Sequence, residues 1–213
     1  MFKFTSSEIR DLIIAFIFIS LSFAIASSGR NMNAVLNILP MIMVGVGAGF
    51  ILHELGHKFV SMKYGYWAEF KLWPQGLLFA LITSFFGFVF AAPGAVYTYA
   101  NYMTDEINGK ISIAGPVVNI LLAIIFLAIS VIFYQDAHYG GNPLLIFIIC
   151  SLGYSINSFL AVFNLLPIGN LDGSKVLRWN AGIWICVIAI AGIMTIASMT
   201  MGVESIVRLI LGL

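Results

Sequence analysis

The chain has little charge. Only 9% of its 213 residues are Asp, Glu, Lys or Arg, whereas 61% are hydrophobic, and the mean hydropathy is +1.04. Because soluble domains carry roughly 25% charged residues, this composition excludes a soluble globular protein and indicates an integral membrane protein. The formal net charge of +1 provides no strongly basic surface, so we expect the lipid bilayer and no nucleic acid as a partner.

Cysteine is scarce too. Cys150 and Cys186 both lie in apolar segments and form no CxxC pair, which argues against a disulfide framework. We expect both to be small buried hydrophobic residues. The chain has no internal repeat, no low-complexity tract and no polar stretch long enough for an accessory soluble domain. We therefore expect a single membrane-embedded domain over residues 1–213.

Long apolar runs are abundant. About 20 apolar residues cross a bilayer as a helix, and apolar runs occur at 12–26, 35–60, 75–99, 111–134, 143–166, 181–199 and 203–213. The last run is short enough to lie in the membrane interface. The first resembles a signal peptide, but a retained signal-anchor helix explains it equally well, and we expect retention. The runs predict an all-α integral membrane protein with five to six transmembrane helices, in a multi-pass arrangement.

Two histidines and a glutamate stand out within the second run. Residues 53–57 read His53-Glu54-Leu55-Gly56-His57. Imidazoles four residues apart lie one turn apart on one helix face and can bind the same metal ion, and Glu54 can take a proton from metal-bound water. Ionisable groups at membrane depth are costly and by default functional. The motif therefore predicts a zinc-dependent hydrolase whose active site lies within the bilayer.

A catalytic zinc ion usually has three protein ligands, and Asp172 is a candidate for the third. It belongs to the run 164–173, in which Pro167 and neighbouring glycines break the helix. Broken backbone at membrane depth is tolerated where it is buried or lines a cavity, so a carboxylate presented from this break is well suited to meet a metal. His138, in the polar loop 135–142, is expected to be solvated and far from the site. A glutamate as third ligand is also conceivable, although no downstream glutamate lies in a comparable break.

Glycines precede the two histidines at the same four-residue spacing, at Gly45 and Gly49. They predict close packing of two membrane helices. A groove beside the metal that admits an extended substrate strand is the alternative.

Three pieces of the chain together resemble the site-2 protease family of intramembrane zinc metalloproteases. They are His53-Glu54-Leu55-Gly56-His57, Ala114-Gly115-Pro116-Val117-Val118-Asn119, and Asn164-Leu165-Leu166-Pro167 with Leu171-Asp172-Gly173. The resemblance implies zinc held by His53, His57 and Asp172, with Glu54 as general base. It also implies hydrolysis of peptide bonds in or near transmembrane segments of membrane-protein substrates. On the same resemblance Asn119 and Asn164 bind the substrate backbone or stabilise the developing oxyanion; interhelical hydrogen bonding is the alternative for both.

Other functions remain open. A membrane protein that binds or transports metal ions would use the same ligands, but it has no need of a base at Glu54. A catalytically silent relative would bind transmembrane helices without cutting them, but every expected catalytic position is present. The chain lacks the inserted soluble domain of many family members and has Ser174-Lys175 where many continue with glycine.

The positions of the ligands predict the topology. The histidines lie near the end of their run, and Asp172 lies just past the run 143–166, so one ion can hold all three only if an even number of crossings separates them. The runs 111–134 and 143–166 supply two. The stretch 75–99 should therefore not cross, and we expect a re-entrant or interfacial hairpin around 75–104, turned near Gly87 or Pro93-Gly94. Eight of the ten basic residues then share one side, which by the positive-inside rule places the active site toward the cytoplasmic face of the cell membrane.

Overall fold

The computed structural model describes residues 4–29 and 31–213. Within them, five helices are long and apolar enough to cross a membrane: α1 (Ser6–Ser27), the continuous helix Met32–Lys63, α5 (Asp105–Ala137), α6 (Gly141–Asn164) and α8 (Ala181–Met201). This confirms the all-α membrane architecture. The structure has five candidate spans, the lower end of the five to six that the sequence predicts.

The second of these helices is not regular along its length. It consists of α2 (Met32–Val46), a π-helical turn η1 (Gly47–Ile51) and α3 (Leu52–Lys63). Single π-turns inside α-helices displace the backbone hydrogen bonds and occur frequently at functional sites. Here the π-turn ends at Ile51, two residues before His53, so the irregularity lies next to the residues that the sequence marks as functional.

The stretch 75–99 does not form a spanning helix. The helix α4 (Pro74–Ser84) has 11 residues, about 16 Å at 1.5 Å per residue, which is roughly half of a hydrocarbon core. The chain turns at Gly87, whose φ is +79°, and returns as β2 (Gly94–Tyr99). This strand pairs antiparallel with β1 (Trp67–Leu72), which precedes α4. The expected hairpin is therefore confirmed, with its turn at Gly87, but the two strands were not expected.

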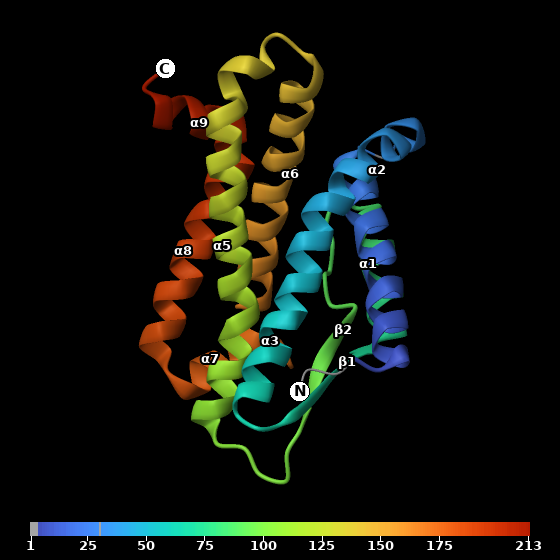
Figure 1. Cartoon of the computed structure of the whole chain (residues 1–213), viewed down its shortest axis with the longest axis vertical. Coiled ribbons are helices and arrows are strands. Elements are labelled where there is room, and N and C mark those ends of the chain that lie inside the picture. Colours follow the sequence, from blue (N-terminus) through green and yellow to red (C-terminus); the bar gives the residue numbers. More distant parts are fainter. Residues whose placement is uncertain (1–3, 30) are drawn as a thin grey trace.

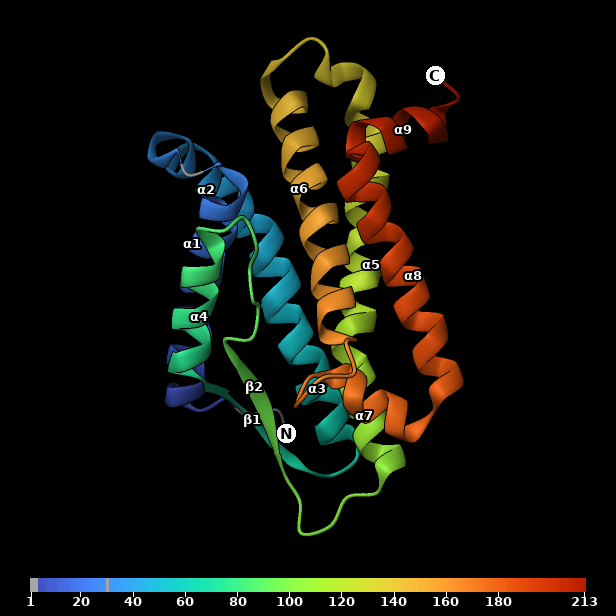
Figure 2. The same ribbon diagram turned by 180° about the vertical axis from the view of Figure 1, so that it is seen from behind.

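The segment His53–His57 lies on α3, in the middle of the molecule. Helix α3 packs against α5 on one face and against the sheet on another, and Figures 1 and 2 show α5, α6 and α8 on one side of it and α1, α4 and the sheet on the other. The short helix α7 (Asp172–Trp179) lies at the same end as the sheet, whereas α9 (Val203–Leu211) crosses the far end of α8 (Figure 1). Residues from both sides can thus reach α3.

A buried ion pair ties the sheet side to α3. Lys58 Nζ lies 2.5 Å from Glu8 Oε2, and both side chains are 1% exposed. The other carboxylate oxygen of Glu8 accepts a hydrogen bond from the Phe70 backbone N–H at 3.1 Å. Buried charges are tolerated when they are paired and hydrogen-bonded, so Glu8 links α1, α3 and β1 at a single point.

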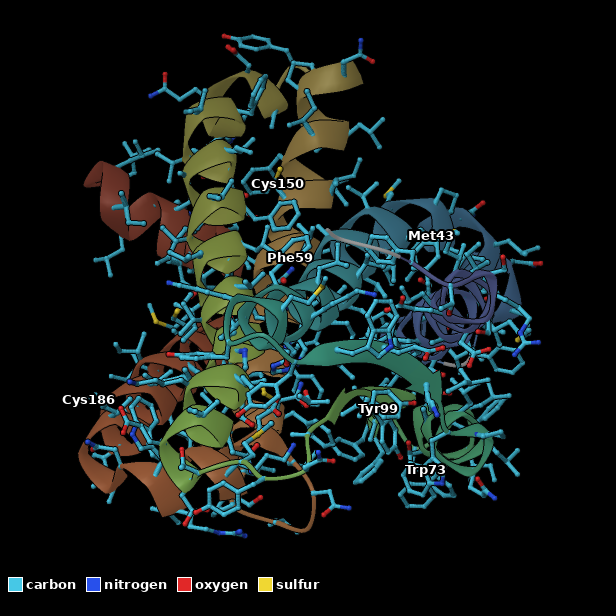
Figure 3. All side chains as sticks on the ribbon, turned by 60° about the horizontal axis from the view of Figure 1, so that its bottom comes forward. Met43, Phe59, Trp73, Tyr99, Cys150 and Cys186 are labelled. Atoms are coloured by element: carbon cyan, nitrogen blue, oxygen red, sulfur yellow. The ribbon has the colours of Figure 1, made fainter. Side chains whose placement is uncertain are left out.

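The two cysteines differ in their environment. Cys150 is buried on α6, as expected, but Cys186 is exposed on α8, and Figure 3 shows it on the outer side of the helices, away from the sheet. The expectation of a buried residue is wrong for Cys186, because an apolar helix at the edge of the molecule exposes most of its surface.

Candidate metal centre

Three predicted ligands converge between α3 and α7. The Nε2 atoms of His53 and His57 lie 3.0 Å apart, and Asp172 Oδ2 lies 3.4 Å from the first and 3.0 Å from the second. All three side chains are buried, and among the described residues they form a group that could hold a metal ion, with ligand atoms within 4.8 Å of one another. Separations near 3 Å suit an ion bonded at about 2.0–2.2 Å to each ligand. His138 is not in this group, as expected.

Helix α5 orients both imidazoles. His57 Nδ1 lies 2.8 Å from the carbonyl oxygen of Ile111, and His53 Nδ1 lies 2.6 Å from Oδ1 of Asn119. A ligating histidine commonly donates its second ring N–H to such an acceptor, which fixes the ring and its tautomer. In both rings this leaves Nε2 facing Asp172.

Gly115 explains why α5 can come this close. A Cβ atom at this position would lie 2.5 Å from His57 Nε2 and 2.6 Å from His53 Nε2. Any side chain here would occupy the place of the metal ligands, so the glycine of the second motif is a requirement of the site.

Asp172 is presented by a tightly folded break between α6 and α7. A Cβ atom at Gly173 would lie 1.9 Å from the Leu165 carbonyl oxygen, so glycine after Asp172 is required. Burial alone would raise the pKa of the Asp172 carboxyl group, but His57, His53 and Lys175 outweigh it and hold that pKa well below its usual range. Lys175 Nζ lies 3.5 Å from Oδ1 of Asp172. The candidate third ligand is therefore an anionic carboxylate, the form that binds a metal.

Glu54 faces the same centre from α3. It is buried, and its Oε2 atom has no hydrogen-bond partner among residues 4–29 and 31–213. The backbone amide of Val96 in β2 interacts with its carboxylate. Buried polar atoms are rarely left without a partner, and an exception needs an explanation. A carboxylate oxygen held open beside three metal ligands is suited to accept a proton.

A cavity of about 430 Å³ joins these residues to the sheet. Its lining includes the three ligands, Glu54, Asn164, Lys175 and residues 94–98 of β2. The sheet side lies around Trp73 and Tyr99 in Figure 3.

In the part of the chain that the structure describes, no further strand pairs with the edge of β2 that faces away from β1. On β1, the Phe70 and Leu72 N–H groups point away from β2, toward Glu8 and Asp11. Their partners Val96 and Gly94 therefore occupy the non-hydrogen-bonded positions of the ladder, where backbone groups point away from the neighbouring strand. Residues 94–98 of β2 and Glu54 line the same cavity.

The two asparagines differ. Asn119 is fully buried and bonded to His53, Gly49 and Asn157, which supports the alternative of interhelical hydrogen bonding. Asn164 lines the cavity and donates to Leu160 of its own helix at 2.9 Å, and its substrate-binding role stays a prediction. The sequence analysis missed Asn157; the signal available was a polar side chain inside a membrane run.

Known proteins agree with this centre. The chain is 44% identical over 185 residues to "Putative zinc metalloprotease MJ0611" of Methanocaldococcus jannaschii, covering 86% of this chain and 90% of that protein. It is 32% identical over 145 residues to "Zinc metalloprotease MJ0392" of the same organism, covering 68% of this chain and 34% of that protein. It is also 29% identical over 159 residues to "Putative zinc metalloprotease YwhC" of Bacillus subtilis, covering 67% of this chain and 70% of that protein. No family model and no solved structure matches the chain.

The fold and the site define a helical membrane protein with a buried metal centre built from two histidines and an aspartate. With the relatives just described, the chain belongs to the zinc metalloproteases. Its cofactor is zinc, and two imidazole nitrogens with one carboxylate oxygen are a donor set that zinc accepts.

Proposed function

We propose that the chain is an intramembrane protease of the site-2 type, which hydrolyses peptide bonds in or near transmembrane segments of membrane-protein substrates. The observation that carries this proposal is the position of Glu54 and the ligand cluster. They lie on one cavity, between helices long and apolar enough to cross a membrane. The whole chain, residues 1–213, acts as one membrane-embedded domain whose partners are the bilayer and the substrate.

In the proposed mechanism His53, His57 and Asp172 hold the zinc ion. Zinc supplies Lewis acidity and makes water a nucleophile near neutral pH. Glu54 takes the proton of the attacking water on its open Oε2 and then delivers it to the leaving amine. Asn164, on the wall of the same cavity, binds the substrate backbone beside the reacting bond.

The open edge of β2 supports an extended substrate. Peptide bonds inside a helix are shielded by the backbone hydrogen bonds, so a substrate helix has to unwind before attack. An unwound segment needs new partners for its N–H and C=O groups, and the outward positions of β2, Gly94 and Val96, offer them as a strand edge does in strand addition. Because Val96 and Glu54 line the same cavity, a strand bound there passes the base.

The base provides the test of this proposal. Glu54→Gln keeps all three ligands, so we expect the purified protein to retain zinc while cleavage of a test transmembrane substrate falls at least 10²-fold, since proton transfer contributes about 10²–10⁴-fold. Glu69→Gln, on β1 and away from the cavity, is the matched control and should cleave normally. Near-normal turnover by Glu54→Gln would refute the hydrolase mechanism. Zinc uptake into proteoliposomes without any cleavage would favour a transporter instead.

We also propose that the site opens toward the cytoplasmic face of the cell membrane. The return of the chain at Gly87 and the pairing of β1 with β2 support an uncrossed stretch 75–99, and thus one side for Lys71 and Lys110. In a background without native cysteines, Lys71→Cys and Lys110→Cys should react with an impermeant thiol reagent from the cytoplasmic side only. Labelling from opposite sides would contradict the topology.

A further inference from the structure

A chain of two buried amide groups runs from His53 into the helix bundle. Oδ1 of Asn119 lies 2.6 Å from His53 Nδ1. The Nδ2 group of Asn119 donates to the Gly49 carbonyl oxygen and to Oδ1 of Asn157, both at 3.0 Å. The oxygen of the Asn119 amide and both hydrogens of its NH₂ group thus each have a partner.

Backbone carbonyl groups also orient the second amide. Nδ2 of Asn157 donates to the Gly153 carbonyl oxygen at 2.8 Å and to the Gly45 carbonyl oxygen at 3.4 Å. Both asparagine side chains are 0% exposed, so water does not compete for these bonds.

The backbone carbonyl groups fix which atoms donate and which accept along this series of hydrogen bonds. A carbonyl oxygen only accepts hydrogen bonds, so the Nδ2 groups must face Gly49, Gly45 and Gly153. Oδ1 of Asn119 must then face His53, and an amide oxygen also only accepts. His53 therefore carries its proton on Nδ1, and the lone pair of Nε2 faces His57 and Asp172.

Local backbone features make this contact possible. The Gly49 carbonyl belongs to the π-turn η1, where the regular bonding pattern is displaced. A Cβ atom at Gly49 would lie 2.7 Å from Oδ1 of Asn157, and one at Gly45 would lie 3.1 Å from the Gly153 Cα atom. The glycine row before the histidines therefore serves close packing against α6, as the sequence predicts. The alternative of a substrate groove beside the metal stays a prediction.

The two histidines differ in how they are held. His57 donates to a backbone carbonyl, that of Ile111, which no substitution removes. His53 depends on a side chain. The position of its proton can therefore be altered by changing Asn119 alone.

We propose that Asn119 and Asn157 are positioning residues that lock His53 in the Nδ1–H form with Nε2 directed at zinc. Neither residue touches the substrate. The inference rests on the proposed function only in taking His53 as a zinc ligand.

Zinc affinity, measured by competition with a chromophoric chelator, tests this role. Asn119→Leu removes the acceptor and should weaken zinc binding about 10–100-fold, the usual cost of losing such an outer contact. Asn119→Asp keeps an acceptor for His53 but loses both donors. It should therefore bind zinc more tightly than Asn119→Leu and yet unfold at a lower temperature than Asn119→Leu. A role as helix glue alone predicts that zinc affinity follows stability. An Asp variant that binds zinc no better than the Leu variant would overturn the proposal.

Asn157→Leu provides a second variant, farther from the metal. It leaves the contact between His53 and Asn119 but removes one acceptor of the Asn119 amide, so zinc binding should weaken severalfold. Ser158→Ala is the matched control, because Ser158 is equally buried on the same helix and donates to Tyr154 of that helix. Unchanged affinity in Asn157→Leu would remove Asn157 from the proposal.

Histidine spectra report the position of the ring proton directly. The chain has three histidines, so ¹⁵N-histidine labelling of the zinc-loaded protein yields few signals. Two solvent-protected Nδ1–H protons are expected, from His53 and His57, and Asn119→Leu should abolish protection at the first only. A single protected proton in the wild-type protein would refute the proposal. If His53→Ala keeps full zinc affinity, the ligand assignment fails instead, so the two failures are distinguishable.

Discussion

Helix α3 is held in different ways on its two sides. Toward the bundle, neutral groups on α5 and α6 make directional hydrogen bonds that reach the ligand imidazoles, as Asn119 does for His53. Toward the sheet, the buried ion pair of Lys58 with Glu8 anchors α3. The bundle side therefore controls the orientation of the ligands, and the sheet side controls where the open edge of β2 lies relative to Glu54.

The chemistry of each side suits its task. An amide hydrogen bond is directional and sets the angle of a ring. A buried ion pair tolerates changes of angle, but removal of one partner leaves an uncompensated charge. Disturbing the bundle side should therefore change zinc affinity, and disturbing the sheet side should change stability and substrate binding with the zinc in place.

Removal of a ligand gives the largest expected effect. His53→Ala, His57→Ala and Asp172→Ala should each lose most of their zinc during dialysis against a mild chelator, because each removes one of three donors. His138→Ala, outside the group, should keep it. Metal content per protein decides the outcome. Full zinc retention by Asp172→Ala would exclude that residue from the site.

Breaking the ion pair should come second. Lys58→Met leaves Glu8 buried and charged, so the free energy of unfolding should fall by about 3–5 kcal/mol. The double variant with Glu8→Gln removes both charges and should recover much of that loss. Thermal unfolding in detergent measures both, and zinc affinity should change little in the folded protein. A large loss of zinc affinity in the double variant would show that the two sides are not independent.

The open strand edge gives the smallest of these effects. Val96→Pro removes one outward N–H of β2, and proline is tolerated at such edge positions. We expect kcat/KM to fall about tenfold, the equivalent of one hydrogen bond of roughly 1–1.5 kcal/mol, with zinc content unchanged. Val96→Ala keeps the N–H and is the control. Equal activity of the two variants would mean that the edge does not bind substrate.

The sequence predicted what depends on local spacing. The four-residue interval places His53 and His57 on one face, and the helix break places Asp172 at a cavity. The even number of crossings between them predicted the hairpin that turns at Gly87.

Contacts between residues far apart in the sequence could not be predicted from local spacing. The strands β1 and β2 form because the segments before and after α4 pair with each other, which no local pattern in either reveals. Glu8 and Asn157 find partners 50 and 38 residues away. The sequence could identify Asn157 as a costly polar group in an apolar run, but it could not name what either residue binds. The sequence marks Asn119 as a candidate site residue, but it does not reveal that its partner is His53.

The distances along the chain between these partners also set an order of assembly during synthesis. Glu8 meets Lys58 after 50 residues and Phe70 after 62, so the sheet side has its polar partners early. Asp172 follows His57 by about 115 residues, which takes roughly 6–23 seconds at the usual 5–20 residues per second of translation. The nascent chain thus carries Glu54 and two of the three candidate ligands through most of its insertion, but it lacks Asp172 until α7 emerges. A centre divided in this way stays incomplete until nearly the whole chain has been made.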